Sequence, residues 1–258
     1  MIYKISPTPS LLKRGEKRQK CHIHLCEGLW FLLTGEVRKN IFCIMLNGKK
    51  FLGPVFIGLL LCFLSACDRP QITGMDFDQI DVSRDPIQGS PSSKDPIIIE
   101  MENYRFTLTP LAEYRLSGMV VSRETYSDDW NAKVSPFDLA IVWGKLTEPE
   151  YDRYMTYDQS NRWYFYRWKA DKPFDDSYVI SHSSNNHIIP GNKNIEIAIN
   201  AIRRKEKVTL EGALVNLAGT VKGEKVTWNT SLSRKDTGDG SCELFYVTKV
   251  RIDTKVYE

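Results

Sequence analysis

Long hydrophobic runs are almost absent from this chain of 258 residues. The one clear run, residues 51–63, is 13 residues long, whereas a membrane-spanning helix needs about 20 apolar residues. The run follows two lysines and precedes the sequence Leu-Ser-Ala-Cys at positions 64–67. A charged start, a short apolar segment and a small-residue cleavage site together form a secretory signal peptide. The sequence therefore predicts an export signal over residues 45–66.

The cysteine that ends this motif, Cys67, resembles the acylated cysteine of the bacterial lipobox. The resemblance implies that Cys67 carries the lipid and becomes the first residue of a mature protein anchored to a bacterial cell membrane and facing the periplasm. Stable anchoring takes more than one acyl chain, and lipoproteins carry a diacylglycerol plus an amide-linked chain. By resemblance to the sorting rule of enteric bacteria, Asp68 favours the inner over the outer membrane. An uncleaved hydrophobic anchor with an incidental cysteine is the alternative.

Residues 1–44 precede the usual start of such a signal. They hold Cys21, His22, His24 and Cys26, which superficially suggest zinc. Structural zinc sites draw their ligands from two separated pairs, and this cluster has no second pair. We interpret residues 1–44 as an over-extended start or a disordered leader, and we expect no metal site there.

Downstream of Cys67 the chain has little cysteine and no excess of positive charge. Cys242 is the one later cysteine, which excludes an intramolecular disulfide, and its alternating surroundings indicate a buried structural thiol. Residues 1–67 hold 10 of the 35 basic and 3 of the 32 acidic residues, which leaves 25 and 29 and a net charge of −4. Nucleic-acid binding needs a concentrated basic face, so we expect no nucleic-acid partner. No glycine-rich phosphate loop joins a strand to a helix, and we expect no cofactor.

Helical periodicity is also scarce, and alternation with period two dominates. Residues 67–94 are rich in Asp, Ser, Pro and Gly and are predicted to be a flexible tether. Residues 95–258 are predicted to form a single β-rich domain with a clear helix at 193–204 and a weaker one at 148–155. The predicted strands are residues 97–101, 104–108, 114–122, 139–143, 163–168, 208–217, 225–229 and 243–252.

These elements predict a mainly β (α+β) fold with a mostly antiparallel sheet. Gly118 and Gly212 interrupt apolar strands and are expected to mark sharp bends or bulges. A small barrel like those that bind oligonucleotides or oligosaccharides (OB-like), with one or two helices, is the preferred architecture. An open α+β sheet is the alternative.

Five motifs of this domain, given at the end of this paragraph, resemble those of a family of bacterial exported proteins. This resemblance implies no particular activity for the chain. The likeness covers about residues 114–250 and supports the domain boundary. The motifs are YRLSGMVVS (114–122), SPFDLAIVWG (135–144), RWY (162–164), SHSSNNHIIP (181–190) and TSLSRKDTGDGSCE (230–243).

Histidines supply the first candidate site. His182 and His187 lie five positions apart in a polar stretch. A metal site that used both histidines would need further ligands, such as Asp175, Asp176 or Glu243. The alternative is that Asn and Ser side chains cap this loop while the histidines bond to the backbone.

An aromatic strand supplies the second candidate site. Trp163, Tyr164, Tyr166 and Trp168 occupy both faces of one predicted strand and could stack on a glycan. The alternative packs one face into the core and the other under a loop or helix. The triplet at 236–238 matches that of aspartic proteases but is better explained as a turn.

Two classes of function follow. The first, which we prefer, is a non-catalytic lipoprotein that binds an envelope protein or glycan. The second is an envelope hydrolase that uses the His182/His187 loop with a carboxylate, with or without a metal ion. Convergence of both histidines and an acidic side chain in one concave pocket would favour the hydrolase.

Overall fold

The computed structural model describes residues 3–6 and 69–258. Cys67, the predicted signal peptide at 45–66 and all of residues 1–44 except 3–6 lie outside the described residues. Residues 3–6 and 69–258 belong to one compact unit. Within the described ranges, no helix is both long and apolar enough to cross a membrane.

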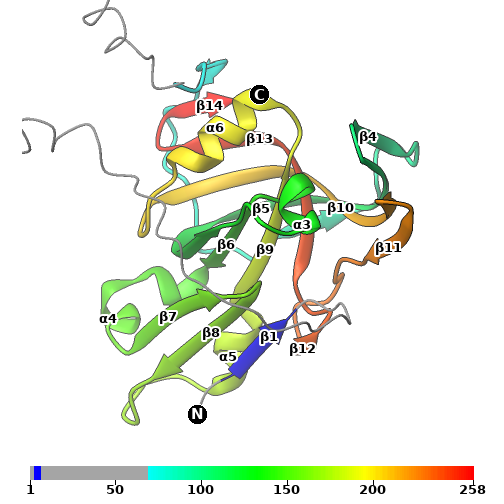
Figure 1. Cartoon of the computed structure of the whole chain (residues 1–258). Coiled ribbons are helices and arrows are strands. Elements are labelled where there is room, and N and C mark those ends of the chain that lie inside the picture. The colour runs from blue at the N-terminus through cyan, green and yellow to red at the C-terminus, as the bar shows by residue number, and fades with distance from the viewer. Residues whose placement is uncertain (1–2, 7–68) are drawn as a thin grey trace, which may run out of the picture. The chain divides into compact units, whose positions relative to one another are not determined.

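Five strands pair in a closed ring (Figure 1). Each is bonded to two others, and only one of the five pairings, β9 with β13, is parallel. In ring order the strands are β5 (Tyr104–Thr125), β6 (Phe137–Val142), β9 (Ser183–Pro190), β13 (Glu243–Ile252) and β10 (Lys207–Val221). The mainly β class and the mostly antiparallel pairing are therefore confirmed, with β9 and β13 as the parallel pair of the ring.

The connectivity of the ring supports the OB-like interpretation over the open sheet. In chain order the five ring strands are β5, β6, β9, β10 and β13. Around the ring their order is 1-2-3-5-4, and strand 4 closes on strand 1, which is a Greek-key order found in OB-folds. The helix α6 (Lys193–Ala201) lies between the third and fourth strands. It begins at Asn192, whose side chain accepts a hydrogen bond from the Ile195 amide.

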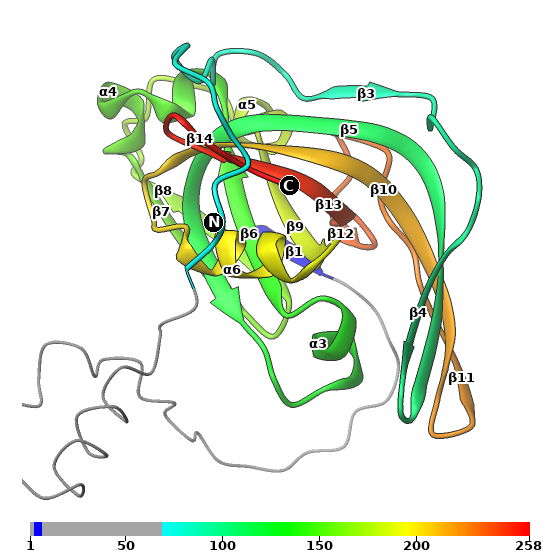
Figure 2. The ribbon, with the colours of Figure 1, turned by 90° about the horizontal axis from the view of Figure 1, so that it is seen from above.

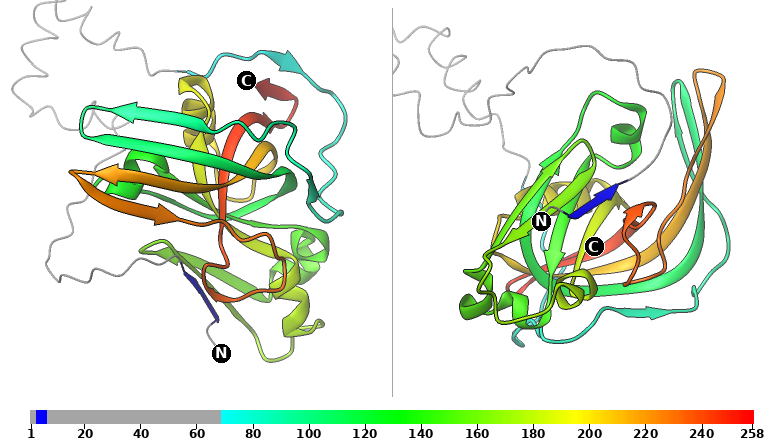
Figure 3. Two further views of the ribbon diagram at one scale, coloured as in Figure 1. Left: turned by 90° about the vertical axis from the view of Figure 1, so that its right-hand side faces the viewer. Right: turned by 90° about the horizontal axis from the view of Figure 1, so that it is seen from below.

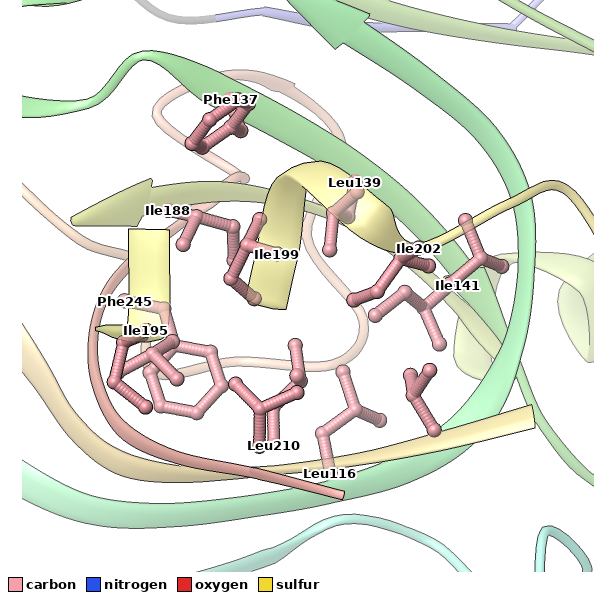
Figure 4. Packing of buried hydrophobic residues seen from close by; sticks show 14 of the residues in the cluster. Leu116, Phe137, Leu139, Ile141, Ile188, Ile195, Ile199, Ile202, Leu210 and Phe245 are labelled. Carbon is pink, nitrogen blue, oxygen red and sulfur yellow. The ribbon is translucent and has the colours of Figure 1, made fainter. Parts of the chain in front are cut away.

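The interior of the ring is apolar (Figure 4). Leu139 and Ile141 alternate inward along β6, and α6 adds Ile195 and Ile199 from one of its faces. These side chains are fully buried, and each such burial stabilises the fold by about 1.5–3 kcal/mol. Apolar residues at every second position of the strands and at every third or fourth position of the helix therefore build one core.

A second sheet covers the outer face of β6. It consists of β7 (Met155–Ser160), β8 (Trp163–Trp168), β1 (Tyr3–Ser6) and β12 (Gly238–Asp239). The outward Ala140 and Val142 of β6 pack in one buried cluster with aromatic side chains of β7 and β8. All six residues of β6 are consequently buried.

The turn between β7 and β8 has only two residues. Asn161 and Arg162 both have positive φ, 52° and 68°, between the paired residues Ser160 and Trp163. Positive φ at both central positions defines the type I′ turn, whose twist suits hairpins. An arginine in this conformation is unusual, and its side chain has a special position described below.

The ends of β5 and β10 continue past the ring as a curved arm (Figures 2 and 3). There β4 (Ile97–Met101) pairs with β5, and β11 (Glu224–Trp228) pairs with β10. The short helix α3 (Trp130–Val134) packs on the arm through Trp130, whose ring lies 5.9 Å from Phe106 and 6.2 Å from Trp228.

Glycines permit two close approaches between strands. The register of β10 against β13 shifts at Gly212, as predicted, and a Cβ there would fall onto the carbonyl of Tyr246. Gly118 differs from the prediction, because the register of β5 against β6 shifts later, between Val120 and Ser122. At Gly118 a Cβ would lie 2.7 Å from the carbonyl oxygen of Val142, so close strand contact explains this glycine.

Residues 69–94, called the strap below, run along the ring and carry β2 (Gly74–Met75) and β3 (Ile87–Gly89). These strands pair with β14 (Lys255–Tyr257) and β5. Ile80 and Val82 are buried, although composition predicts a flexible tether. Strand pairing needs backbone groups rather than apolar side chains, which is why the composition did not reveal it. The remaining elements are η1 (Gly144–Thr147), α4 (Pro149–Asp152) and α5 (Asp176–Ser181).

Candidate functional site

Three charged or ionisable side chains meet in the interior between the ring, the β7–β8 turn and the arm. They are Asp138 of β6, Arg162 of the turn and His187 of β9, and we call them the Asp138 cluster. Asp138 Oδ1 lies 2.8 Å from His187 Nδ1 and 3.0 Å from Arg162 Nη1. All three residues are buried. Asp138 and His187 are direct partners in the β6–β9 pairing, so the sheet register itself brings them together.

Aromatic rings and a backbone carbonyl enclose the guanidinium of Arg162. Its carbon lies 3.8 Å from the ring centre of Tyr126 and 5.5 Å from that of Trp228. Its Nη1 also donates to the carbonyl oxygen of Ser135 at 2.8 Å, and its Nη2 lies 3.3 Å from Asp129, which caps α3. The arginine therefore joins the second sheet, the ring and α3.

The charges in the cluster stabilise one another. Burial would raise the pKa of Asp138, but the charges and hydrogen bonds of His187 and Arg162 outweigh it and hold that pKa below its ordinary value. Within the described part of the chain, Asp138 Oδ2, His187 Nε2 and Arg162 Nε have no hydrogen-bond partner. Each buried polar atom left in that state costs about 1–3 kcal/mol.

The cluster has two of the three groups of a hydrolytic triad but no access. A carboxylate that orients a histidine is the arrangement that activates a serine nucleophile. Here, however, His187 is fully buried and its ring lies 4.7 Å from the Trp228 ring. A substrate atom cannot reach Nε2 in this arrangement, so the geometry serves to cross-link strands.

His182 lies apart from this cluster. It ends α5, its Nδ1 is 2.9 Å from the carbonyl oxygen of Tyr178, and its ring stacks on the Tyr178 ring at 3.7 Å. Its Nε2 lies 3.8 Å from Asp85 of the strap. His187 lies five positions further along the chain, within β9, where each residue advances the strand by about 3.3 Å. The two histidines therefore do not share one site.

The other proposed metal donors are also dispersed. Asp176 pairs with Lys172 at 2.6 Å, and Glu243 pairs with Arg234. Among residues 69–258, no group of three or more His, Cys, Asp or Glu side chains is arranged to hold a metal ion.

The aromatic strand is largely part of the core. Tyr164 and Tyr166 are buried against the ring, so they cannot stack on a ligand, and the packing alternative describes them. Trp163 and Trp168 are half-buried. The Trp168 ring lies 5.8 Å from that of Tyr166, and the Lys172 ammonium lies 5.0 Å above it.

A second buried ion pair lies near the end of the chain. Glu243 contacts Arg234, whose Nη1 donates to the Tyr114 hydroxyl at 2.7 Å. Burial raises the pKa of Glu243 to about 7, although Arg234 opposes the rise. Next to it, burial raises the pKa of the Cys242 thiol, which suits a structural rather than a nucleophilic cysteine. Asp236 accepts a hydrogen bond from the Ser231 hydroxyl within a turn that includes Gly238 at φ 92°.

A groove that the sequence did not reveal lies on the outside of the ring. Its volume is about 940 Å³, within the range of ligand pockets. Tyr246, Ala213 and Ile97 supply apolar and aromatic surface. Charged side chains of both signs line it as well, namely Asp95, Glu113, Arg115, Glu211, Lys249 and Glu258.

The β10 bulge at Gly212 lies in this groove. Bulges bend a strand locally, and the interrupted strand at Gly212 is the only sequence signal that points here. The segment from Ile87 to Ile97 forms another wall. Because its composition reads as a linker, the sequence did not predict it as part of a site.

Comparisons with protein-family profiles, with curated proteins and with solved structures found no significant match for this chain.

Proposed function

We propose that the chain is a non-catalytic, lipid-anchored binding module of the bacterial envelope and that the groove beside Tyr246 binds its ligand. One observation carries the proposal. The ionisable side chains suited to catalysis are buried and engaged with one another, whereas the groove combines open volume, an aromatic ring and charged side chains. An open concavity without a reactive group suits recognition.

A glycan is the ligand class that the groove fits best. Sugars present hydroxyl groups and apolar faces together, so their sites combine aromatic rings with precisely placed polar groups. Tyr246 is half-buried and presents such a ring. Arg115 and Glu211 lie 3.7 Å apart across the pairing of β5 with β10 and offer a donor and an acceptor side by side. The acidic mature chain with its export signal makes an envelope glycan the natural candidate.

The outer face that OB-folds use for their ligands is not available here. Those folds bind oligonucleotides or oligosaccharides over their second and third strands, which correspond to β6 and β9. The outward side chains of β6 are buried under β7 and β8. The proposed site therefore lies on a different part of the ring, over β5, β10 and β13. The hydrolase alternative gains no comparable support, since its two histidines are apart.

Calorimetric titration of the purified lipoprotein with soluble peptidoglycan fragments tests this proposal. We expect Tyr246→Ala to weaken binding at least tenfold, because the aromatic surface is lost. Tyr151→Ala on α4 is the matched control and should leave the affinity unchanged. Absence of binding to any envelope glycan would overturn the glycan proposal. A photo-crosslinker at position 246 that captures a protein would replace the glycan with a protein partner.

A further inference from the structure

The strap is fixed to the ring almost from its first described residue. The Gln71 amide donates to Asn194 Oδ1 at 2.6 Å, and Asn194 Nδ2 donates back to the Gln71 carbonyl at 2.9 Å. The Thr73 amide then donates to the Val256 carbonyl oxygen at 2.9 Å. These bonds link the strap to α6 and β14 at the point where it enters the domain.

This attachment limits the distance between the domain and its expected lipid. Gln71 lies four positions after Cys67, and an extended chain spans at most about 3.6 Å per residue. The Cα atom of Gln71 can thus lie no more than about 14 Å from that of Cys67. An acylated Cys67 sits at the bilayer surface, so the start of the strap has to lie at the headgroup region or directly above it.

Large apolar side chains are exposed in this same short stretch. Ile72 and Met75 are each 50% exposed, and Phe77 is 79% exposed, the highest value among the exposed large hydrophobic residues of the described chain. The strand pairing of Met75 with Lys255 and the contacts of Asp76 with Arg251 fix this stretch in place. The side chains are therefore presented by a held backbone rather than by a mobile linker.

Charged side chains of both signs surround this stretch. Asp76 is paired with Arg251, and Lys255 is the cross-strand partner of Met75. The shallow depression beside Phe77 is lined by Lys207 and by the carboxylates of Asp78, Glu206 and Asp253. Apolar side chains at the boundary of headgroups and acyl chains reach about 5–10 Å into it, so those of this stretch can insert while the charged groups beside them remain among the hydrated headgroups.

We propose that residues 72–77 form a membrane-contact face, through which the domain rests directly on the lipid surface that holds its anchor. This face contacts the layer of the membrane where the lipid headgroups meet the acyl chains. The inference rests on the proposed acylation of Cys67 and adds an orientation to it. The acyl chains hold the protein at the membrane, and the strap prevents the domain from rotating freely above it.

Spin labels on the purified, acylated mature chain test the proposal. In that chain Cys67 is blocked and Cys242 is buried, so an introduced cysteine reacts alone. The label goes at Phe77→Cys, and the matched control is Ile98→Cys, an exposed apolar position on β4. Vesicles of phosphatidylethanolamine and phosphatidylglycerol supply the lipid surface. Collision with oxygen and with a water-soluble nickel complex is then measured by electron paramagnetic resonance.

We expect the label at position 77 to lose at least threefold in collisions with the nickel complex and to gain collisions with oxygen, while the label at 98 stays accessible. Equal nickel access at both positions, on protein that floats with the vesicles, overturns the contact face but leaves the anchor intact. A chain that lacks acyl groups by mass spectrometry and does not float overturns both. In a second variant, Phe77→Ser should reduce the protection of a label at Met75→Cys severalfold, and unchanged protection counts against a role for Phe77.

Discussion

Asp138 and His187 face each other as directly paired residues of β6 and β9, and their side chains share a 2.8 Å contact in the interior. Arg162 approaches the same carboxylate oxygen from the turn of another sheet. One buried carboxylate therefore joins three separate parts of the chain. This arrangement makes the cluster the point where stability should respond most sharply to a single change.

The first prediction concerns the carboxylate. Asp138→Asn should lower the free energy of unfolding by about 3–5 kcal/mol, because it removes the buried counter-charge of the Arg162 guanidinium. The matched control is Asp129→Asn, since Asp129 contacts the same arginine at 3.3 Å but has a side chain 48% exposed. It should cost about 1 kcal/mol or less. Urea denaturation of both variants measures the difference, and equal losses would contradict the role given to Asp138.

The second prediction concerns the shape of the Arg162 side chain. Arg162→Lys keeps the charge but loses the flat guanidinium that stacks on Tyr126 and donates to Ser135. We expect a loss of about 1–3 kcal/mol in thermal or urea unfolding. The same change at Arg167, exposed on the neighbouring strand, should have almost no effect. A similar small effect at both sites would show that charge alone matters at position 162.

The third prediction concerns pH. The pKa of Glu243 is raised to about 7 from an ordinary 4.5, so between these values the folded protein binds a proton that the unfolded chain releases. The free energy of unfolding should therefore fall as pH rises from about 4.5 to about 7.

The variant Glu243→Gln, which resembles the protonated side chain, should flatten this part of the profile. Urea unfolding at several pH values measures it, with Glu196→Gln on α6, a half-exposed glutamate, as the control. Asp138 acts in the opposite sense: its lowered pKa contributes stability above the ordinary value of 3.8 that is lost as the pH falls through the folded value. A Glu243→Gln profile identical to that of the parent would place the pH response elsewhere.

The fourth prediction concerns the bulge of β10. Gly212→Ala should destabilise the fold by about 1–3 kcal/mol, because the added Cβ meets the backbone of Tyr246. Gly89→Ala is the control, as its Cβ would meet nothing within 4 Å. Since Gly212 also lines the groove, Gly212→Ala should weaken glycan binding as well. Unfolding curves that do not distinguish the two variants would refute the close approach.

The sequence predicts four of the five ring strands, because these follow simple rules. It does not predict β9, whose polar residues 183–187 are typical of a loop. Alternation along β6 and β13 and the helical spacing of Ile195 and Ile199 can each be read without knowledge of the fold. The parallel pairing of β9 with β13 could not, since parallel and antiparallel strands share the same local pattern. The helix that separates β9 from β10 indicates the OB-like order only after the pairings are known.

The polar cluster and the groove were much harder to predict. The sequence indicates His187 as a candidate, but Arg162 stands in a motif with no assigned role, and Asp138 lies 49 residues from its histidine. These three side chains come together because of the register of the sheet and a two-residue turn, which become known only from the tertiary structure. The strap was missed for a related reason: its contacts are mostly backbone bonds, and composition reports side chains.

The pairing of β1 has a consequence for biosynthesis. Residues 3–6 add a strand to the edge of β8 and reach β12 on the other side, yet they precede the cleavage site expected after Ala66. Removal of the signal would take this strand away and leave this edge of β8 open to pairing. Precursor and mature protein would then differ by one strand of the second sheet, and hydrogen exchange at the β8 amides would report the processing step.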